Sequence, residues 1–130
     1  MATATVKKEV RKKMKGCFID QQPGFEFDIE IDGEWIATCK ALTPRSWSYI
    51  KKHAYGKMAL ENGEVKVDID PYQLQICMIY KALDEWAFDR PINIENVNLL
   101  GKDYREAIYE QINKHEEEFN ANKEAIVKNS

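Results

Sequence analysis

The segment 25–32 alternates apolar and acidic residues without interruption. Alternation with a period of two predicts a β-strand that buries one face. The Asp32-Gly33 pair then supplies a turn sequence, and we predict that residues 35–42 return as the second strand of an antiparallel hairpin. The side chains of the first strand expected in the core are Phe25, Phe27, Ile29 and Ile31.

The register of this hairpin depends on the length of its loop. A two-residue loop would place Ile36 opposite Ile29, whereas a three-residue loop, with Gly33 as a left-handed bulge residue, would place Trp35 there. The second register is favoured because it removes more apolar area from water, by burying Trp35, Ala37 and Cys39 rather than Ile36, Thr38 and Lys40. On this register, Trp35→Ala is expected to cost about 3 to 5 kcal/mol.

Two Xaa-Pro pairs mark helix starts, because each combines a good N-cap residue with a proline at the first helical position. After Thr43-Pro44, the spacing of the apolar residues predicts one amphipathic stripe made of Trp47, Ile50, Ala54 and Met58. After Asp70-Pro71, apolar residues at helical spacing predict a helix over 72–86. Between these helices, Asn62-Gly63 predicts a second turn, followed by a short strand at 65–69.

The remainder of the chain is predicted to be helical. Arg90-Pro91 ends the preceding helix, Asn93 can cap a short helical turn, and the apolar spacing over 104–119 predicts about five turns of amphipathic helix. The fold class is therefore α+β, with an N-terminal antiparallel β-hairpin and a short third strand packed against three to four α-helices. Its expected parts are a basic, flexible arm at 1–16, a single domain at 17–119, and a frayed or disordered tail at 120–130.

Length and charge add two observations. The 130 residues, of which 44% are hydrophobic and 32% charged, suffice for one core. The net charge of −3 hides a basic segment at 6–15 and an acidic segment at 17–34. The basic arm is either a solvated terminus or a contact with nucleic acid or a membrane surface. No apolar run long enough to span a bilayer and no signal peptide are found, so a cytoplasmic location is expected.

Catalytic, cofactor-binding and metal-binding motifs are not found in the sequence, and we expect no enzymatic activity and no cofactor. Its two histidines, His53 and His115, fall beside or within apolar stripes and are interpreted as partly buried packing residues. The three cysteines are widely spaced and are expected to be reduced thiols. The alternating carboxylates of segment 25–32 lie along a line, so they are interpreted as the solvated face of a sheet and not as a metal site.

The helix predicted over 72–86 has an apolar sector wider than one stripe. Such a helix is either covered on two sides within the core or presents part of its surface to a partner. Both interpretations stay open at this point. The candidate partner-binding residues are Tyr72, Leu74, Cys77, Met78 and Trp86.

The order of these parts over Phe25 to Phe119 resembles the tail assembly chaperones of long-tailed bacteriophages and related prophages. The resemblance is carried by Glu34-Trp35 and Lys40 to Pro44 in the hairpin region, Gly63 to Asp70, Tyr72 to Trp86, Arg90-Pro91-Ile92, Asn96 to Leu100, and a last helix from about Asp103. It implies a small α+β protein that is not an enzyme. It implies the helical tape measure protein as client, the tail tube protein as a further partner, and self-association.

Two other functions are compatible with the sequence. The first 16 residues match no motif shared with that family, and a nucleic-acid-associated regulator or host-defence inhibitor would use such a basic arm. A structural component of the virion, such as a head-to-tail connector, is the other alternative.

Overall fold

The computed structural model describes residues 13–128, and within the last helix it describes side chains as far as Ala121. After a short 3-10 turn, η1 (Ile19–Gln21), the chain forms the predicted hairpin from β1 (Glu26–Ile31) and β2 (Glu34–Lys40). Asp32 and Gly33 both have positive φ, 54° and 79°. They form the two-residue turn whose twist matches that of the strands, and aspartate and glycine are the residues that tolerate this conformation.

The predicted register of this hairpin is wrong. Ile31 pairs with Glu34 across the two-residue turn, and a β-bulge at Ile36 then places Ala37 opposite Ile29. Ile36 and Ala37 are both buried as a result, as is Cys39, whereas Trp35 remains 41% exposed. Neither loop length alone predicts this arrangement, because the bulge shifts the register after the turn has set it.

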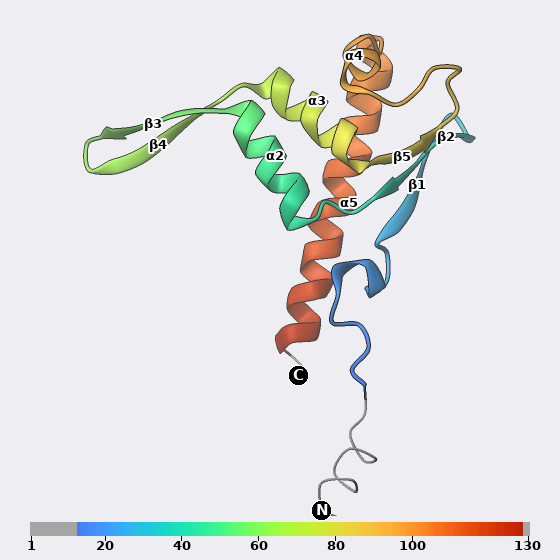
Figure 1. The fold of residues 1–130 in the computed structure, drawn as a ribbon, viewed down its shortest axis with the longest axis horizontal. Helices are drawn as coiled ribbons and strands as arrows, with labels where there is room; N and C mark the ends of the chain where they lie inside the picture. The colour runs from blue at the N-terminus through green and yellow to red at the C-terminus, as the bar shows by residue number, and fades with distance from the viewer. Residues whose placement is uncertain (1–12, 129–130) are drawn as a thin grey trace, which may run out of the picture.

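Helix α2 (Pro44–Ala54) begins at the predicted cap, where Thr43 Oγ1 accepts a hydrogen bond from Ser46 N at 3.1 Å. The helix ends at Ala54, so the predicted stripe is wrong at Met58. The chain passes directly into β3 (Tyr55–Glu61), which pairs with β4 (Glu64–Ile69) across Asn62-Gly63. These two strands form a separate hairpin that projects from the body (Figure 1).

Helix α3 (Pro71–Ala82) also begins as predicted, because Asp70 Oδ1 accepts from the backbone N–H groups of Tyr72 and Gln73 at 3.0 and 3.2 Å. The helix ends earlier than predicted. Residues Leu83–Trp86 form β5, which pairs with β2 and gives the three-stranded sheet β1-β2-β5. Hydrogen bonding to the open edge of β2 outweighs the helical spacing of Leu83 and Trp86.

The last two helices are α4 (Ile94–Asn98), capped by Asn93 as predicted, and α5 (Lys102–Lys128). Helix α5 continues through 120–128, where the sequence analysis expects a tail, and it is the long orange-to-red helix that runs vertically in Figure 1. Helix α3 contacts α2, α4 and α5 and is therefore the centre of the helical layer. The fully buried core side chains are contributed by every layer: Ile29, Cys39, Ile50, Ile76, Cys77, Met78, Ile79, Val97, Ile108 and Ile112.

The predicted fold class is confirmed: an antiparallel hairpin with a third strand packs against four α-helices. The third strand of that sheet is β5 and not the strand at 65–69, which belongs to the projecting hairpin. Most of the predicted basic arm, residues 1–12, lies outside the described residues. Within the part of the chain that is described, no helix has the length and apolar character needed to cross a membrane.

Candidate functional site

The residues predicted to bind a partner do not form one surface. Cys77 and Met78 are 1% and 2% exposed, because α3 is covered by helices on several sides, so the wide apolar sector is mainly core. Leu74 is half-buried against the same core. At the end of the molecule that carries α4, Tyr72 is 39% exposed, whereas Trp86 is half-buried and packs against the core.

Trp86 belongs to a hollow of about 300 Å³ between the end of β5 and the start of α5. Its ring meets Phe88 edge-on, with centroids 5.3 Å apart, and Phe88 meets Tyr104 in the same way at 5.8 Å. Trp86 Nε1 donates a hydrogen bond to the Arg90 carbonyl, which holds the indole ring in place. Leu99, Leu100 and Tyr104 complete the apolar lining, and we call this feature the aromatic hollow.

The surface beside the aromatic hollow is held together by polar contacts. Tyr72 Oη donates to Asn98 Oδ1 at 2.9 Å, and the Arg105 guanidinium lies 5.0 Å from the centroid of the Tyr72 ring. These contacts join the start of α3 to α4 and α5. None of these three residues lines the hollow itself, and Leu99, 67% exposed, is accessible at its edge.

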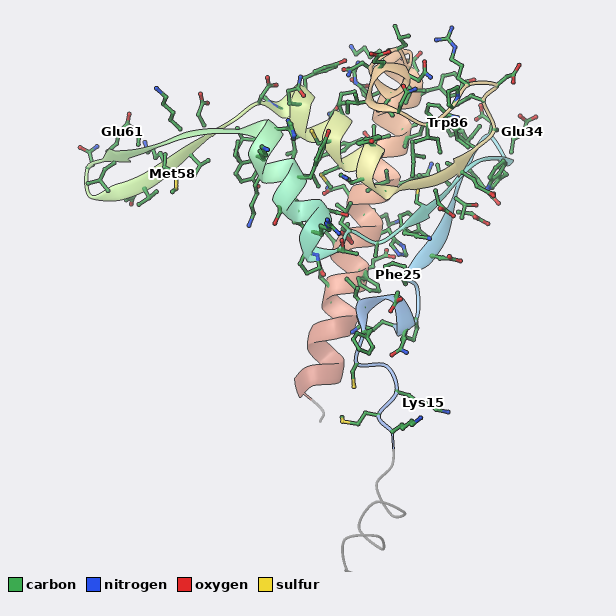
Figure 2. The ribbon with its side chains drawn as sticks, viewed as in Figure 1. Lys15, Phe25, Glu34, Met58, Glu61 and Trp86 are labelled. Atoms are coloured by element: carbon green, nitrogen blue, oxygen red, sulfur yellow. The ribbon has the colours of Figure 1, made fainter. Side chains whose placement is uncertain are left out.

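The projecting hairpin presents a second apolar surface. Met58 pairs with Val67, and Leu60 pairs with Val65, so these four side chains lie on the same face of the ribbon, together with Ile69. Met58 and Leu60 are 73% and 76% exposed. We call Met58, Leu60, Val65, Val67 and Ile69 the hairpin face, and Figure 2 shows Met58 on the ribbon far from Trp86.

The other side of the ribbon is polar. It carries Ala59, Glu61, Glu64, Lys66 and Asp68, which alternate with the residues of the hairpin face. Lys66 Nζ lies 3.2 Å from Glu61 Oε2. This alternation normally accompanies a sheet with one face against a core, but here the apolar face lies in solvent.

Two of the three cysteines, Cys39 and Cys77, are buried. Burial, with the nearby carboxylates of Asp28 and Asp84, raises the pKa of the Cys39 thiol to about 12, so the thiolate is suppressed at neutral pH. Burial also raises the pKa of Cys77. All three cysteines are free, as predicted. Among the described residues, no group of three or more His, Cys, Asp or Glu side chains could hold a metal ion.

The two histidines have packing roles, although His53 is more exposed than predicted. His53 is exposed at the end of α2 with its ring against Tyr49, at a centroid distance of 4.3 Å. His115 is half-buried, stacks on Phe27 at 3.7 Å, and donates through Nε2 to the Gly24 carbonyl at 2.6 Å. His115 thereby attaches α5 to the beginning of the first hairpin.

Glu116 is a buried carboxyl that also connects distant segments. Its Oε1 accepts a hydrogen bond from the backbone N–H of Leu42 at 3.0 Å, while Oε2 has no hydrogen-bond partner among the described residues. Burial raises the pKa of Glu116, and the Leu42 N–H and the neighbouring His115 offset part of that rise. The folded protein therefore holds this proton more strongly than the unfolded chain does.

This difference predicts a pH dependence of stability. Because the folded-state pKa is raised, the contribution of Glu116 is most favourable at low pH and is lost as the pH rises through the folded-state pKa. As the pH falls from about 7.5 to about 5, the melting temperature of the wild type should rise relative to that of Glu116→Gln, whose side chain does not titrate. A melting-temperature difference that is constant over this range would contradict the assignment.

Sequence reasoning missed most of both surfaces. The alternation around Asn62-Gly63 was a usable signal for the hairpin, but Met58 was assigned to a helix because it continues the stripe of α2. Phe88, Leu99 and Tyr104 come from three separate segments, and no local pattern brings them together.

Comparison of the chain with protein-family models, with curated protein sequences and with solved structures gave no match.

Proposed function

We propose that this chain is an assembly chaperone of a long-tailed bacteriophage or prophage, which binds the tape measure protein in the host cytoplasm and assists tail tube assembly. The observation that supports this proposal best is the aromatic hollow, with exposed apolar side chains at its edge. A client helix presents apolar anchors at spacings of three and four residues, and such anchors fit hollows between helices.

The size and composition of the hollow suit one apolar anchor of a helical client. About 300 Å³ is enough for a large side chain, and aromatic walls provide contact area with little loss of conformational entropy. Arg90 also lines the hollow and gives it a cationic group for an acidic neighbour of the anchor. The exposed Leu99 and Tyr104 would then be the first side chains that the client covers.

The test is co-expression of the full chain with the tape measure protein of the same phage or prophage. We expect a soluble complex with the wild type and loss of most soluble client with Leu99→Lys, because a charge at this edge would be desolvated by the client. Phe18→Lys is the matched control, since Phe18 is 69% exposed and lies outside the hollow. It should behave as the wild type.

Two results would overturn the proposal. If the tape measure protein is equally soluble without this chain, the chaperone function is wrong. If Leu99→Lys and Phe18→Lys both retain the soluble client, the aromatic hollow is not its binding site. Circular dichroism of the purified variants separates loss of binding from loss of fold.

A further inference from the structure

Strand β1 lies at the edge of the three-stranded sheet, so it has a partner strand on one side only among the described residues. The Phe25 carbonyl accepts a hydrogen bond from Ala41 N at 2.7 Å, so the peptide groups of Phe25 and of every second residue after it point toward β2. The N–H and C=O groups of Glu26, Asp28 and Glu30 therefore point away from the sheet. They form a row of backbone donors and acceptors along its edge.

One position of this row is occupied by a side-chain amide. The Gln111 side chain donates through Nε2 to the Glu30 carbonyl at 2.8 Å, and its Oε1 accepts from Glu30 N at 3.4 Å. A carboxamide has the same donor and acceptor as a peptide group, so Gln111 pairs with the edge as a residue of a further strand would. The edge thus already binds a peptide-like group at Glu30.

The next position in the row, Asp28, is open. Outside the β1–β2 ladder, the N–H and C=O groups of Asp28 have no hydrogen-bond partner among the described residues. A hollow of about 270 Å³ lies beside Asp28 between β1 and α5, close to the lower limit of about 300 Å³ for small-ligand sites. A hollow of this size has room for a short segment only. It is lined by Phe27, Asp28, Gln111, Lys114, His115 and Glu118.

The charges along the edge favour a basic segment. Glu26, Asp28 and Glu30 alternate with the core-facing residues of β1, and all three are exposed on the outer face of the sheet. Glu26 and Glu30 form no ion pair within the described part of the chain, and Lys40, which is opposite Glu26, binds Asp84 at 3.6 Å instead. Facing residues of opposite charge stabilise a pair of strands, and like charges destabilise it. A strand added to β1 should therefore carry lysine or arginine at alternate positions.

We propose that the edge of β1 binds an extended, basic segment of a partner protein as a fourth strand. The segment pairs in the antiparallel direction, the more stable one per residue, and exchanges both hydrogen bonds with Asp28. Two of its basic side chains lie on the outer face, opposite Asp28 and Glu26, and the residue between them points to the other face. Pairing ends at Glu30, where Gln111 holds the peptide group. This site is separate from the aromatic hollow and does not rest on the chaperone function.

Two other occupants fit this edge less well. A second copy of β1 would place the carboxylates of Glu26, Asp28 and Glu30 against those of its own strand, which like-charge repulsion opposes. The basic segment at 6–15 of the same chain has a suitable charge. Its described part, Lys13 to Lys15, is exposed and leads away from the beginning of β1 in Figure 1. A separate protein with a basic segment is therefore the favoured occupant.

The test uses the full chain labelled with nitrogen-15 and a capped pentapeptide of alternating lysine and valine, with lysine at both ends. At about 1 mM peptide, exchange of the Asp28 amide hydrogen with solvent should slow by about 5-fold or more, because this N–H donates to the peptide backbone. N-methylation of the central lysine should abolish the protection, since the lysine N–H groups face β1. N-methylation of a valine, whose N–H points away, should preserve it.

Two isosteric variants test the role of charge. Asp28→Asn should raise the Kd of the peptide by about 3-fold or more, because it removes the carboxylate that faces a lysine. The asparagine oxygen can still accept the hydrogen bond from Thr38 Oγ1, so the strand pairing is kept. Glu85→Gln is the matched control, since Glu85 is also exposed but lies on β5, at the opposite edge of the same sheet. It should leave the Kd unchanged.

Several results would overturn the inference. They are an unchanged exchange rate of Asp28 at about 5 mM peptide, equal effects of the two N-methylations, equal effects of the two variants, and equal protection by a peptide with glutamate in place of lysine. Protection before any peptide is added, lost when Lys7, Lys8, Arg11 and Lys12 are replaced by serine, would assign the edge to the chain's own basic segment instead. The chaperone proposal is tested separately at Leu99, so the two failures are distinguishable.

Discussion

Met78→Ala should lower the free energy of unfolding by about 2 to 5 kcal/mol, the range found when a large buried aliphatic side chain is removed from a core. Met78 is 2% exposed on the central helix α3, where it belongs to the main hydrophobic cluster. The helix is contacted by three others, so little local collapse can fill the space left by the thioether. Chemical denaturation followed by circular dichroism measures the change.

Met14→Ala is the matched control for this substitution. Met14 is 83% exposed, and its replacement should change the unfolding free energy by less than about 0.5 kcal/mol. Equal effects of the two substitutions would contradict the placement of Met78 in the core. In that case Met78 would again be a candidate surface residue for binding a partner.

Ile36→Ala should cost about 2 to 5 kcal/mol and more than Trp35→Ala, although tryptophan is the larger side chain. The β-bulge buries Ile36 beside Ala37, whereas the Trp35 indole lies on the outer side of the sheet and donates to Thr38 Oγ1 at 3.1 Å. Trp35→Ala should therefore cost about 1 to 2 kcal/mol, below the range expected for a buried tryptophan.

The same denaturation measurement on both variants decides the register. A larger effect of Trp35→Ala than of Ile36→Ala would support the three-residue loop and would contradict the bulge. A larger effect of Ile36→Ala supports the pairing of Ile29 with Ala37. The comparison is internal to one strand, so differences in expression or in measurement conditions do not affect it.

Local sequence signals predicted the beginnings of elements better than their ends. Thr43, Asp70 and Asn93 each cap a helix as expected, because the cap is a contact between residues two or three positions apart. The helix ends at Ala54 and Ala82 were missed. At both positions the chain leaves the helix to pair with a strand, and this long-range gain overrides the helical spacing of Met58 and Trp86.

The surfaces were less predictable than the elements. Of the residues predicted to bind a partner, Tyr72 is exposed and Trp86 is half-buried at the aromatic hollow, but Cys77 and Met78, predicted by the same criterion, are buried. A wide apolar sector indicates that a helix is covered, without indicating whether its cover comes from the same chain. The sequence likewise did not indicate that the hairpin face is exposed. The alternation of apolar and polar residues is the same whether or not another layer of the fold covers the apolar side.

The hairpin is continuous with a helix at each end, because α2 ends at Ala54 where β3 begins, and β4 ends at Ile69 next to the cap of α3. Asp70 N donates to the Ala54 carbonyl at 2.9 Å, which closes the base of the ribbon between the two helices. No linker separates the two strands from α2 and α3, so we expect a load on the tip of the ribbon to act on both helices. A partner bound at the tip would then change the position of the two helices as well as that of the ribbon.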